Sequence, residues 1–583
     1  MTNLLQQGKV QIIGGSSSAQ YEEKIEANTE VAAFFEKVQI RNLQAVYSEQ
    51  TDENPAADNE GFRGDSVSSD LREMMINDAN GTRRVDVILQ TKDINNPVLR
   101  RILTDNGVGI NNCIGESNTL VANLPLSAVE VLARSGLVNY LSPDRPMLKL
   151  GHVENTVGAL LTRSQAAIPG RAAYTLDGTG IGIAVLDSGM PANHKSFKDN
   201  GNNSRIVFSK NFVTTNSNTD DDYGHGTHVA GVAAGKSDVN GARGVAPNAK
   251  IINLKVLDGQ GRGQTSWLLN ALDWLKLNHQ TYNIRVVNLS LGGLAIDSYT
   301  NDPVCRKVQK LNASGILIVA AAGNEGKKNG QKLYGHIHSP DNSPSALTVG
   351  AVNTKATDSR SDASMATFSS NGPTRSFYTT AGGVRIYANA IKPDVVAPGN
   401  KIVASRAKAN SYLAVNFPDL LNNATNTLNS GDEIITMSGT SMATPVVAGA
   451  AALLFQVNPN LTPGMVKMIF EYTAQPLAGY NMLEQGAGQI NLEGAVRLAK
   501  AYRTDINFNS AMPGMPLLAA NPSASPSPLP SPTSTPQNVS FPTPQTTING
   551  TTFNWSQGIL TNHAYLKGQS LADTFHEVYR NNS

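Results

Sequence analysis

Apolar and polar positions follow two different periods between residues 85 and 142. Over Val85–Leu89 they alternate with a period of two, which is typical of a strand with one buried face. Helical spacing and further extended runs follow, and together they predict strands and helices at 85–89, 97–105, 107–110, 118–124, 127–135 and 138–141. This order of strand, helix, strand, strand, helix and strand predicts a small ferredoxin-like α+β domain.

The pattern changes at about residue 151 and keeps its new form to about residue 503. Short continuous apolar runs at 181–186, 286–289 and 316–321 are typical of parallel strands that are buried on both faces. Segments with helical periodicity, such as 266–278, lie between these runs. We therefore expect an α/β fold, in which helices cover both faces of a mainly parallel sheet.

The flanking segments have weaker patterns. A helix is expected at 29–50, the acidic stretch 49–70 resembles a linker, and Pro, Ser and Thr dominate 512–544. Aromatic residues in the last segment indicate some ordered packing. The predicted organisation is a partly disordered leader at 1–82, the α+β domain at 83–150, the α/β domain at 151–510, a Pro/Ser/Thr-rich linker at 511–546 and a short tail at 547–583.

Composition narrows the function classes. The 583 residues include 40% hydrophobic residues, and 47 Lys and Arg against 46 Asp and Glu leave a net charge of +1. This balance argues against a dedicated nucleic-acid binder, and the two cysteines cannot form a disulfide framework. The longest strongly apolar stretch, Val446–Phe455, is shorter than the about 20 residues that a membrane-spanning helix needs. We expect no membrane span.

Three motifs in the predicted α/β domain carry groups suited to catalysis. Asp187 ends an apolar strand before a glycine turn, although an acid there can also simply cap the turn. His225 lies among small residues and could act as a general base, or it could bind a metal together with His228. Ser441 begins a small-residue helix, with Ser438 as a competing hydroxyl and a helix cap as the structural alternative.

Together the motifs are more specific than any one of them. Acid, imidazole and hydroxyl follow one another in the chain order of subtilisin. The segments Val185–Gly189, His225–Gly231 and Gly439–Pro445 resemble the three signatures of the subtilisin family of serine endopeptidases. The resemblance covers about 151–503 and implies the subtilisin-like three-layer fold, preceded by an inhibitor-like prodomain over 83–150.

The resemblance also implies roles for individual residues. Ser441 would be the nucleophile, His225 its general base and Asp187 the acid that orients the imidazole. Asn324, in the segment Ala320–Gly326, matches the asparagine of the family's oxyanion hole. His228 would be a structural neighbour on the helix. An asparagine in a Gly-Asn turn is the structural alternative for Asn324.

Two further segments would bind the substrate. By the same resemblance, Ser290, Leu291 and Gly292 form a strand edge that pairs with the substrate backbone. They also wall the subsite for the residue before the scissile bond, opposite Ala322 and Gly323. Backbone pairing demands little of the substrate sequence, so we expect broad specificity. The motifs place no acidic cluster in this subsite and support no preference for basic residues.

The resemblance also implies that the chain is made as a zymogen. The prodomain would act as an intramolecular inhibitor, with Met147–Leu150 in the substrate groove and self-cleavage within Met147–Ala159. No cofactor is needed for catalysis. A structural calcium ion is possible at the loop Lys236–Gly241, where Asp238 could be a ligand, although a surface turn explains that loop equally well. The family's other calcium acid is replaced by Ser196.

The expected function is therefore a serine endopeptidase that acts on polypeptides. A selective processing protease, a catalytically silent relative that serves as a binding protein, and a cell-surface structural protein are the alternatives. Cys113 and Cys305 are expected as free thiols, because a bond between them would tether the inhibitor. No signal peptide is visible, but the prodomain and the Pro-rich linker favour an extracellular or cell-surface location.

Overall fold

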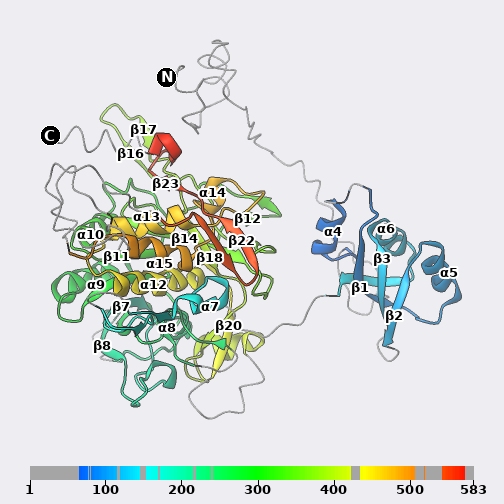
Figure 1. Ribbon diagram of the computed structural model, residues 1–583, viewed down its shortest axis with the longest axis horizontal. Coiled ribbons are helices and arrows are strands. Elements are labelled where there is room, and N and C mark those ends of the chain that lie inside the picture. Colours follow the sequence, from blue (N-terminus) through cyan, green and yellow to red (C-terminus); the bar gives the residue numbers. More distant parts are fainter. Residues whose placement is uncertain are drawn as a thin grey trace. The chain divides into compact units, whose positions relative to one another are not determined.

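The computed structural model describes residues 65–76, 78, 80–114, 118–144, 153–167, 171–213, 218–237, 241–421, 433–505, 518 and 541–571. The helix expected at 29–50 and most of the Pro-rich linker lie outside these residues. The described residues form two compact units, shown in Figure 1. We call residues 65–144 the N-terminal unit and the residues from 153 onward the C-terminal unit.

The N-terminal unit is a four-stranded antiparallel sheet with helices packed on it. Its strands lie in the order β2-β3-β1-β4, which is the ferredoxin-like topology that the sequence predicts. Its later elements are β1 (Arg84–Thr91), α5 (Pro97–Asp105), β2 (Gly109–Ile114), β3 (Thr119–Pro125), α6 (Leu126–Arg134) and β4 (Val138–Pro143). Local chemistry sets the helix start: the Asn96 side chain accepts hydrogen bonds from the backbone N–H groups of Val98 and Leu99, and proline follows it.

This unit begins upstream of the predicted start at residue 83. A further helix, α4 (Ser69–Ile76), begins at the end of the stretch expected to be a linker and lies within the predicted leader 1–82. Val67 and Leu71 are buried in the same core as the sheet, and Ser68 donates its backbone N–H to Leu141 O at 2.9 Å. Val67, Leu71, Met74 and Met75 follow helical spacing, so this helix was a readable signal that the sequence analysis missed beside the acidic stretch.

The C-terminal unit is built on a largely parallel sheet in the order β15-β14-β11-β10-β7-β9-β8, with β18 beside β14. Only the short β14–β15 pairing is antiparallel. The strands are β7 (Gly182–Asp187), β8 (Ile206–Asn211), β9 (Lys250–Lys255), β10 (Ile284–Leu289), β11 (Leu317–Ala321), β14 (Ala346–Asn353), β15 (Ser364–Met365) and β18 (Val395–Pro398). The three predicted apolar runs correspond to β7, β10 and β11, whose apolar residues are all buried.

Helices cover both faces of this sheet, so the predicted α/β fold is confirmed (Figure 1). One face packs against α8 (His225–Ala234), α12 (Thr440–Val457), α13 (Pro463–Thr473) and α15 (Leu492–Ala501), and the other against α9 (Thr265–Asn278) and α10 (Pro303–Ala313). Small residues let α8 and α12 approach closely. A Cβ atom on Gly449 would lie 2.7 Å from Ala233 O, so only glycine fits there.

The remaining elements are short. They are α7 (Val153–Thr156), α11 (Tyr412–Asn416), α14 (Met482–Gln485), β19 (Ile402–Ser405) paired with β20 (Ile434–Met437), and the two-stranded pairs β5 (Ser164–Gln165) with β6 (Tyr174–Thr175), β12 (Lys327–Lys328) with β13 (Gln331–Lys332), β16 (Phe377–Thr379) with β17 (Arg385–Tyr387), β21 (Gln545–Ile548) with β22 (Thr551–Asn554), and β23 (Gly558–Leu560) with β24 (Tyr565–Lys567).

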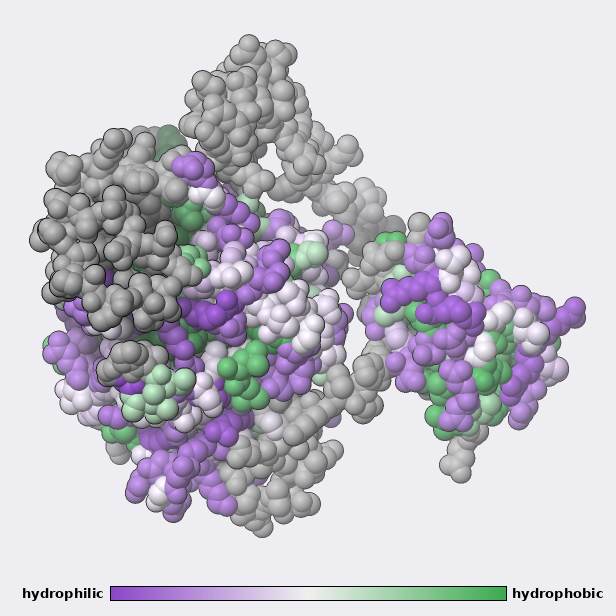
Figure 2. Space-filling model, viewed as in Figure 1, coloured by the Kyte–Doolittle hydropathy of each residue, from purple (hydrophilic) through white to green (hydrophobic). Residues whose placement is uncertain are grey.

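Helix α12 is long and apolar enough to cross a membrane by length and composition alone. The ten-residue stretch considered in the sequence understates it, because small polar residues extend the helix to 18 residues. However, 89% of this helix is buried inside the unit, as expected of a core helix. The face shown in Figure 2 mixes hydrophilic residues with small hydrophobic areas.

The last described segment packs on the C-terminal unit. Phe553 and Trp555 are buried, in agreement with the ordered packing expected from the aromatic residues. The Trp555 indole donates to Thr546 Oγ1 at 2.9 Å, and the Asn491 side chain donates to the same oxygen at 3.0 Å. The predicted boundary at 546/547 falls inside β21, so the tail begins earlier and completes the surface of α15.

We predict that Trp555→Ala lowers the free energy of unfolding by about 3–5 kcal/mol, because it removes a buried indole and its hydrogen bond. Urea unfolding of the Ser441→Ala chain, which prevents autolysis, measures this change. Leu277→Ala on α9 is the matched control: Leu277 is 81% exposed, and its loss should cost less than about 0.5 kcal/mol. Equal effects of both variants would contradict the packing of the tail.

Candidate active site

The site begins at the carboxyl end of β7, in the middle of the parallel sheet. Asp187 is the last residue of this strand and is almost completely buried. His225 is the first residue of α8, and its Nδ1 lies 2.8 Å from Asp187 Oδ1. The structure therefore brings together the acid and the first histidine of the two predicted motifs. This contact occupies Nδ1 and leaves Nε2 as the ring nitrogen that Asp187 does not bind.

Close packing fixes the start of α8 against the turn after β7. The backbone N–H of Gly226 donates to Ser188 Oγ at 2.9 Å. A Cβ atom at Gly226 would lie 2.5 Å from Gly189 O, so any side chain would push the helix away from Asp187. The small residue after His225 is therefore a geometric requirement of the Asp187–His225 contact.

Asp221 is a positioning residue that the sequence reasoning missed. It is completely buried, and its Oδ1 accepts hydrogen bonds from Ser188 Oγ and the Gly224 N–H, both at 2.7 Å. Its Oδ2 accepts from the N–H and hydroxyl of Thr227 at 2.8 and 2.6 Å. Burial raises the pKa of Asp221, and these four donors oppose the rise. Asp221 thus ties the first turn of α8 to the residue that follows Asp187.

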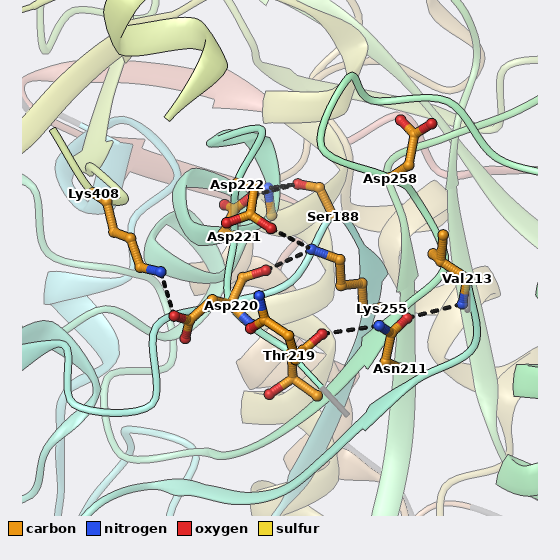
Figure 3. A network of polar contacts seen from close by, with 12 residues as sticks. Ser188, Asn211, Val213, Thr219, Asp220, Asp221, Asp222, Lys255, Asp258 and Lys408 are labelled. Carbon is orange, nitrogen blue, oxygen red and sulfur yellow. Dashed lines mark hydrogen bonds and ion pairs between the residues drawn. The ribbon is translucent and has the colours of Figure 1, made fainter. Parts of the chain in front are cut away.

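Figure 3 shows how the neighbouring acids are neutralised. The Lys255 ammonium donates to Asp220 O at 2.6 Å and lies 3.5 Å from a carboxylate oxygen of Asp222, and Lys408 pairs with the Asp220 side chain. Each of the three consecutive acids before the histidine motif therefore has a different set of partners. The run itself was a visible signal in the sequence, but its contacts depend on residues far away in the chain.

The electrostatics of His225 suit a general base. Burial lowers the pKa of its imidazole, but the charge of Asp187 and the hydrogen bond to it raise the pKa, and a smaller contribution from Asp221 acts in the same direction. The net shift in the pKa of His225 is upward, so the surroundings favour the charged form of the imidazole, as a general base of this kind requires. By contrast, burial lowers the pKa of His228 to about 3, and its Nε2 lies 3.0 Å from Ile402 O.

His225 and His228 therefore face different partners and do not form the metal pair considered as an alternative. Within the described ranges, no group of three or more His, Cys, Asp or Glu side chains could hold a metal ion. Ser196 is buried, and Asp238 lies outside the described residues. The Arg205 guanidinium donates to Ser196 O at 2.8 Å and to Ala234 O at 2.7 Å, so an arginine already occupies these carbonyl groups.

Ser441 lies in the first turn of α12 and contacts the segment after β10. Its hydroxyl donates to Ser290 O at 3.1 Å, while Ser290 Oγ donates to Ser441 O at 2.8 Å. Among the hydrogen bonds of the described residues, none joins the Ser441 hydroxyl to the His225 imidazole. The competing Ser438 accepts the Lys401 N–H at 2.9 Å instead.

Asn324 follows β11 and is fixed by the same helix start. Its side-chain oxygen accepts the Thr440 N–H at 2.9 Å and the Thr440 hydroxyl at 3.1 Å. This arrangement occupies the amide oxygen and leaves the NH₂ group as the donor. A donor beside the nucleophile is what an oxyanion requires.

The two predicted substrate segments emerge from adjacent strands. Ser290, Leu291 and Gly292 follow β10, and Ala322 and Gly323 follow β11. Strands β10 and β11 pair in parallel, with Leu289 opposite Ala320, so both segments leave the same edge of the sheet. Since β7 lies on the other side of β10, acid, substrate segments and amide are neighbours in the sheet order β11-β10-β7.

A buried carboxylate paired with an imidazole, together with a hydroxyl at a helix start and an amide donor, is the set of groups that a serine hydrolase uses. Comparison with known proteins agrees. The sequence profile of the subtilase family matches residues 178–489. Serine protease AprX of Bacillus subtilis (strain 168) is 35% identical over 333 residues, covering 56% of this chain and 68% of that protein.

Subtilisin E of Bacillus subtilis (strain 168) is 32% identical over 381 residues, which cover 65% of this chain and 81% of subtilisin E. Membrane-bound transcription factor site-1 protease of Rattus norvegicus is 30% identical over 350 residues, covering 58% of this chain and 28% of that protein. The chain belongs to the subtilase family. It is a serine endopeptidase that hydrolyses polypeptides and needs no cofactor for catalysis.

We predict that Asp221→Asn moves the acid limb of the pH–activity profile to lower pH. Activity needs neutral His225, whose pKa lies above the ordinary 6.5, and removal of the Asp221 charge lowers that pKa. Loss of the helix anchor should also reduce kcat about 10–100-fold. The profile of kcat/KM against pH measures the shift. Asp258→Asn, at a carboxylate that pairs with Arg262 and is not among the charges that shift the pKa of His225, should leave the acid limb in place. An unmoved limb in Asp221→Asn would contradict the assignment.

Proposed function

We propose that Asp187, His225 and Ser441 are the catalytic triad and that Asn324 supplies the oxyanion hole. The observation that carries this assignment is the 2.8 Å contact between His225 Nδ1 and Asp187 Oδ1 in a buried site. His225 Nε2 takes the proton of the Ser441 hydroxyl as the oxygen attacks the scissile carbonyl, and later gives it to the leaving amine. The Asn324 NH₂ group and the Ser441 N–H bind the oxyanion.

The substrate would bind as an extended strand. Ser290, Leu291 and Gly292 continue from β10 and offer backbone groups to the substrate on one side, and Ala322 and Gly323 complete the subsite for the residue before the scissile bond. Apart from Leu291, the side chains of both segments are small, which supports this role. Backbone recognition also fits an enzyme that acts on many unfolded polypeptides.

The N-terminal unit is proposed as a prodomain that inhibits the C-terminal unit until it is cleaved. Its separate core supports an independently folded domain, and helix α4 extends it upstream of residue 83. The proposed cleavage lies within Met147–Ala159. Residues 153–159 of this range are described, and they pack on the C-terminal unit through the hydrogen bond from Leu492 N to Val157 O at 2.9 Å.

The proposals on calcium binding and on location rest on the resemblance to the family. We propose that any structural calcium ion is held by the loop Lys236–Gly241 through Asp238, and that the protein acts outside the cell or at its surface, as a secreted protease. The similarity to site-1 protease favours selective processing as the second candidate function. A silent binding protein is the weaker alternative, because the four chemical groups are present with suitable contacts.

We predict that the purified protein degrades casein and that Ser441→Ala abolishes this activity. Asn324→Ala should reduce kcat about 100–1,000-fold, because one oxyanion donor is lost. Release of acid-soluble peptides measures both effects. Ser438→Ala is the matched control and should keep most of the activity. Equal activities of the wild-type and Ser441→Ala proteins would refute the mechanism.

We also predict that the active protein starts within residues 147–159, whereas Ser441→Ala remains at full length. N-terminal sequencing and intact mass spectrometry of both proteins test this expectation. A fully active wild-type protein that keeps the N-terminal unit covalently attached would contradict the zymogen proposal. Cleavage of Ser441→Ala by a catalytic amount of wild-type protein would show that processing can also occur between molecules.

A further inference from the structure

Asp341 is a buried acid without a partner. It lies in the segment before β14 and is completely buried, and neither carboxylate oxygen has a hydrogen-bond partner in the part of the chain that the structure describes. The other deeply buried acids differ, because Asp394 accepts from Lys392 at 2.7 Å and Asp221 accepts four hydrogen bonds. A buried carboxylate is costly unless another group compensates for it. The absence of a partner for the Asp341 carboxylate therefore needs an explanation.

The position of Asp341 suggests where that partner comes from. A Cβ atom on Gly292 would lie 3.0 Å from Asp341 Oδ2 and 3.0 Å from His338 Cβ. Gly292 belongs to the proposed subsite for the residue before the scissile bond. A Cβ atom on Gly323, in the opposite wall, would lie 3.2 Å from the His338 ring. Because Gly292 has no side chain, the carboxylate packs directly against the backbone of this segment of the subsite.

The segment that carries Asp341 is held against the substrate strand. Gly293 and Ser339 exchange backbone hydrogen bonds of 2.9 and 2.8 Å. The backbone carbonyl of Asp341 accepts the Thr348 hydroxyl at 2.6 Å, and Asn342 N donates to His338 O at 2.9 Å. These contacts fix the backbone on both sides of the acid. The carboxylate is thus preorganised beside the subsite.

The surrounding groups leave its charge uncompensated. Burial raises the pKa of Asp341 well above its usual range, and Lys392 acts in the opposite direction. The Lys392 ammonium, however, binds Asp394 Oδ2 at 2.7 Å and Ala346 O at 2.9 Å. Two further neighbours add no positive charge, because burial raises the pKa of the Cys305 thiol and lowers that of the His338 imidazole.

We propose that Asp341 binds the basic side chain of a Lys or Arg that precedes the scissile bond, and so directs cleavage to basic residues. This inference rests on the proposed function of the subsite, and it goes beyond the sequence motifs, which place no acidic cluster there and support no preference for basic residues. A long cationic side chain that passes Gly292 brings the donors that the fold itself does not supply. Neutral residues in the subsite leave the acid without compensation, which lowers their cleavage rates.

The test compares four tetrapeptide p-nitroanilides that differ only in the residue before the scissile bond, Lys, Arg, Leu or Phe. Enzyme concentrations are set by titration with a reagent that labels Ser441. We expect wild-type kcat/KM to be at least about 10-fold higher for Lys and Arg than for Leu and Phe. Asp341→Asn should lower kcat/KM for Lys and Arg about 10–100-fold and change it for Leu and Phe by less than about 3-fold.

Glu325→Gln is the matched control. Glu325 is a half-exposed acid that accepts a hydrogen bond from His336 at 2.9 Å, and it directly follows Asn324 in the chain. Loss of the Lys and Arg preference in Glu325→Gln but not in Asp341→Asn would overturn the proposal. An equal loss for all four substrates in Asp341→Asn would mean a purely structural role and would also overturn it. If Asp341→Asn yields no enzyme whose Ser441 the reagent can label, Asp341→Gly is tested in its place.

The experiment separates this inference from the proposed function. An active wild-type enzyme that does not prefer Lys and Arg would overturn the role of Asp341 alone. A wild-type protein that cleaves none of the peptides and whose Ser441 is not labelled would overturn both. A rise or no change in the melting temperature of Asp341→Asn supports the proposal, because an unpaired buried acid kept for binding contributes nothing to stability. A large fall would count against it.

Discussion

The C-terminal unit depends on holding one buried acid in contact with one imidazole. Asp187 Oδ1 accepts hydrogen bonds from His225 Nδ1 and from the Ser188 N–H, both at 2.8 Å. Its Oδ2 has no hydrogen-bond partner among the described residues. Such a carboxylate is stable only in a fixed arrangement of donors. Most of the unusual local features near the site serve that arrangement, including the contact between Gly226 and Gly189 and the four donors around Asp221.

Two buried helices extend this arrangement to the other chemical groups. Helix α8 carries His225 at its first residue, and α12 carries Ser441 in its first turn. Their close contact at Gly449 fixes the two helix starts relative to each other. Thr440 then connects α12 to Asn324 through two hydrogen bonds. The apolar character of α12 lets it pack in the core and place Ser441 and Thr440 at its start, which explains why a helix of membrane-like composition lies in a core.

The features that were predictable from sequence are those that local patterns encode. Buried parallel strands produce continuous apolar runs, so β7, β10 and β11 were predicted, and the motifs pointed to Asp187, His225 and Ser441. Features that depend on distant partners were not predictable. The burial of Val67 needs the sheet of the N-terminal unit, and that of Trp555 needs α15. Asp221 and Asp341 are ordinary acids in the sequence, and only their surroundings distinguish them.

Backbone pairing and a buried acid make different contributions to substrate choice. Hydrogen bonds from the strand edge at Ser290–Gly292 act on every extended peptide and supply affinity without selection. Discrimination comes from a group that one substrate satisfies and another leaves unpaired, because the cost of the unpaired group then falls on the wrong substrate. Gly292 in the wall of the subsite and Asp341 behind it would provide this discrimination without a change in the backbone. The same fold can therefore move from broad degradation toward selective processing by placing one carboxylate, while Asp187, His225 and Ser441 stay unchanged.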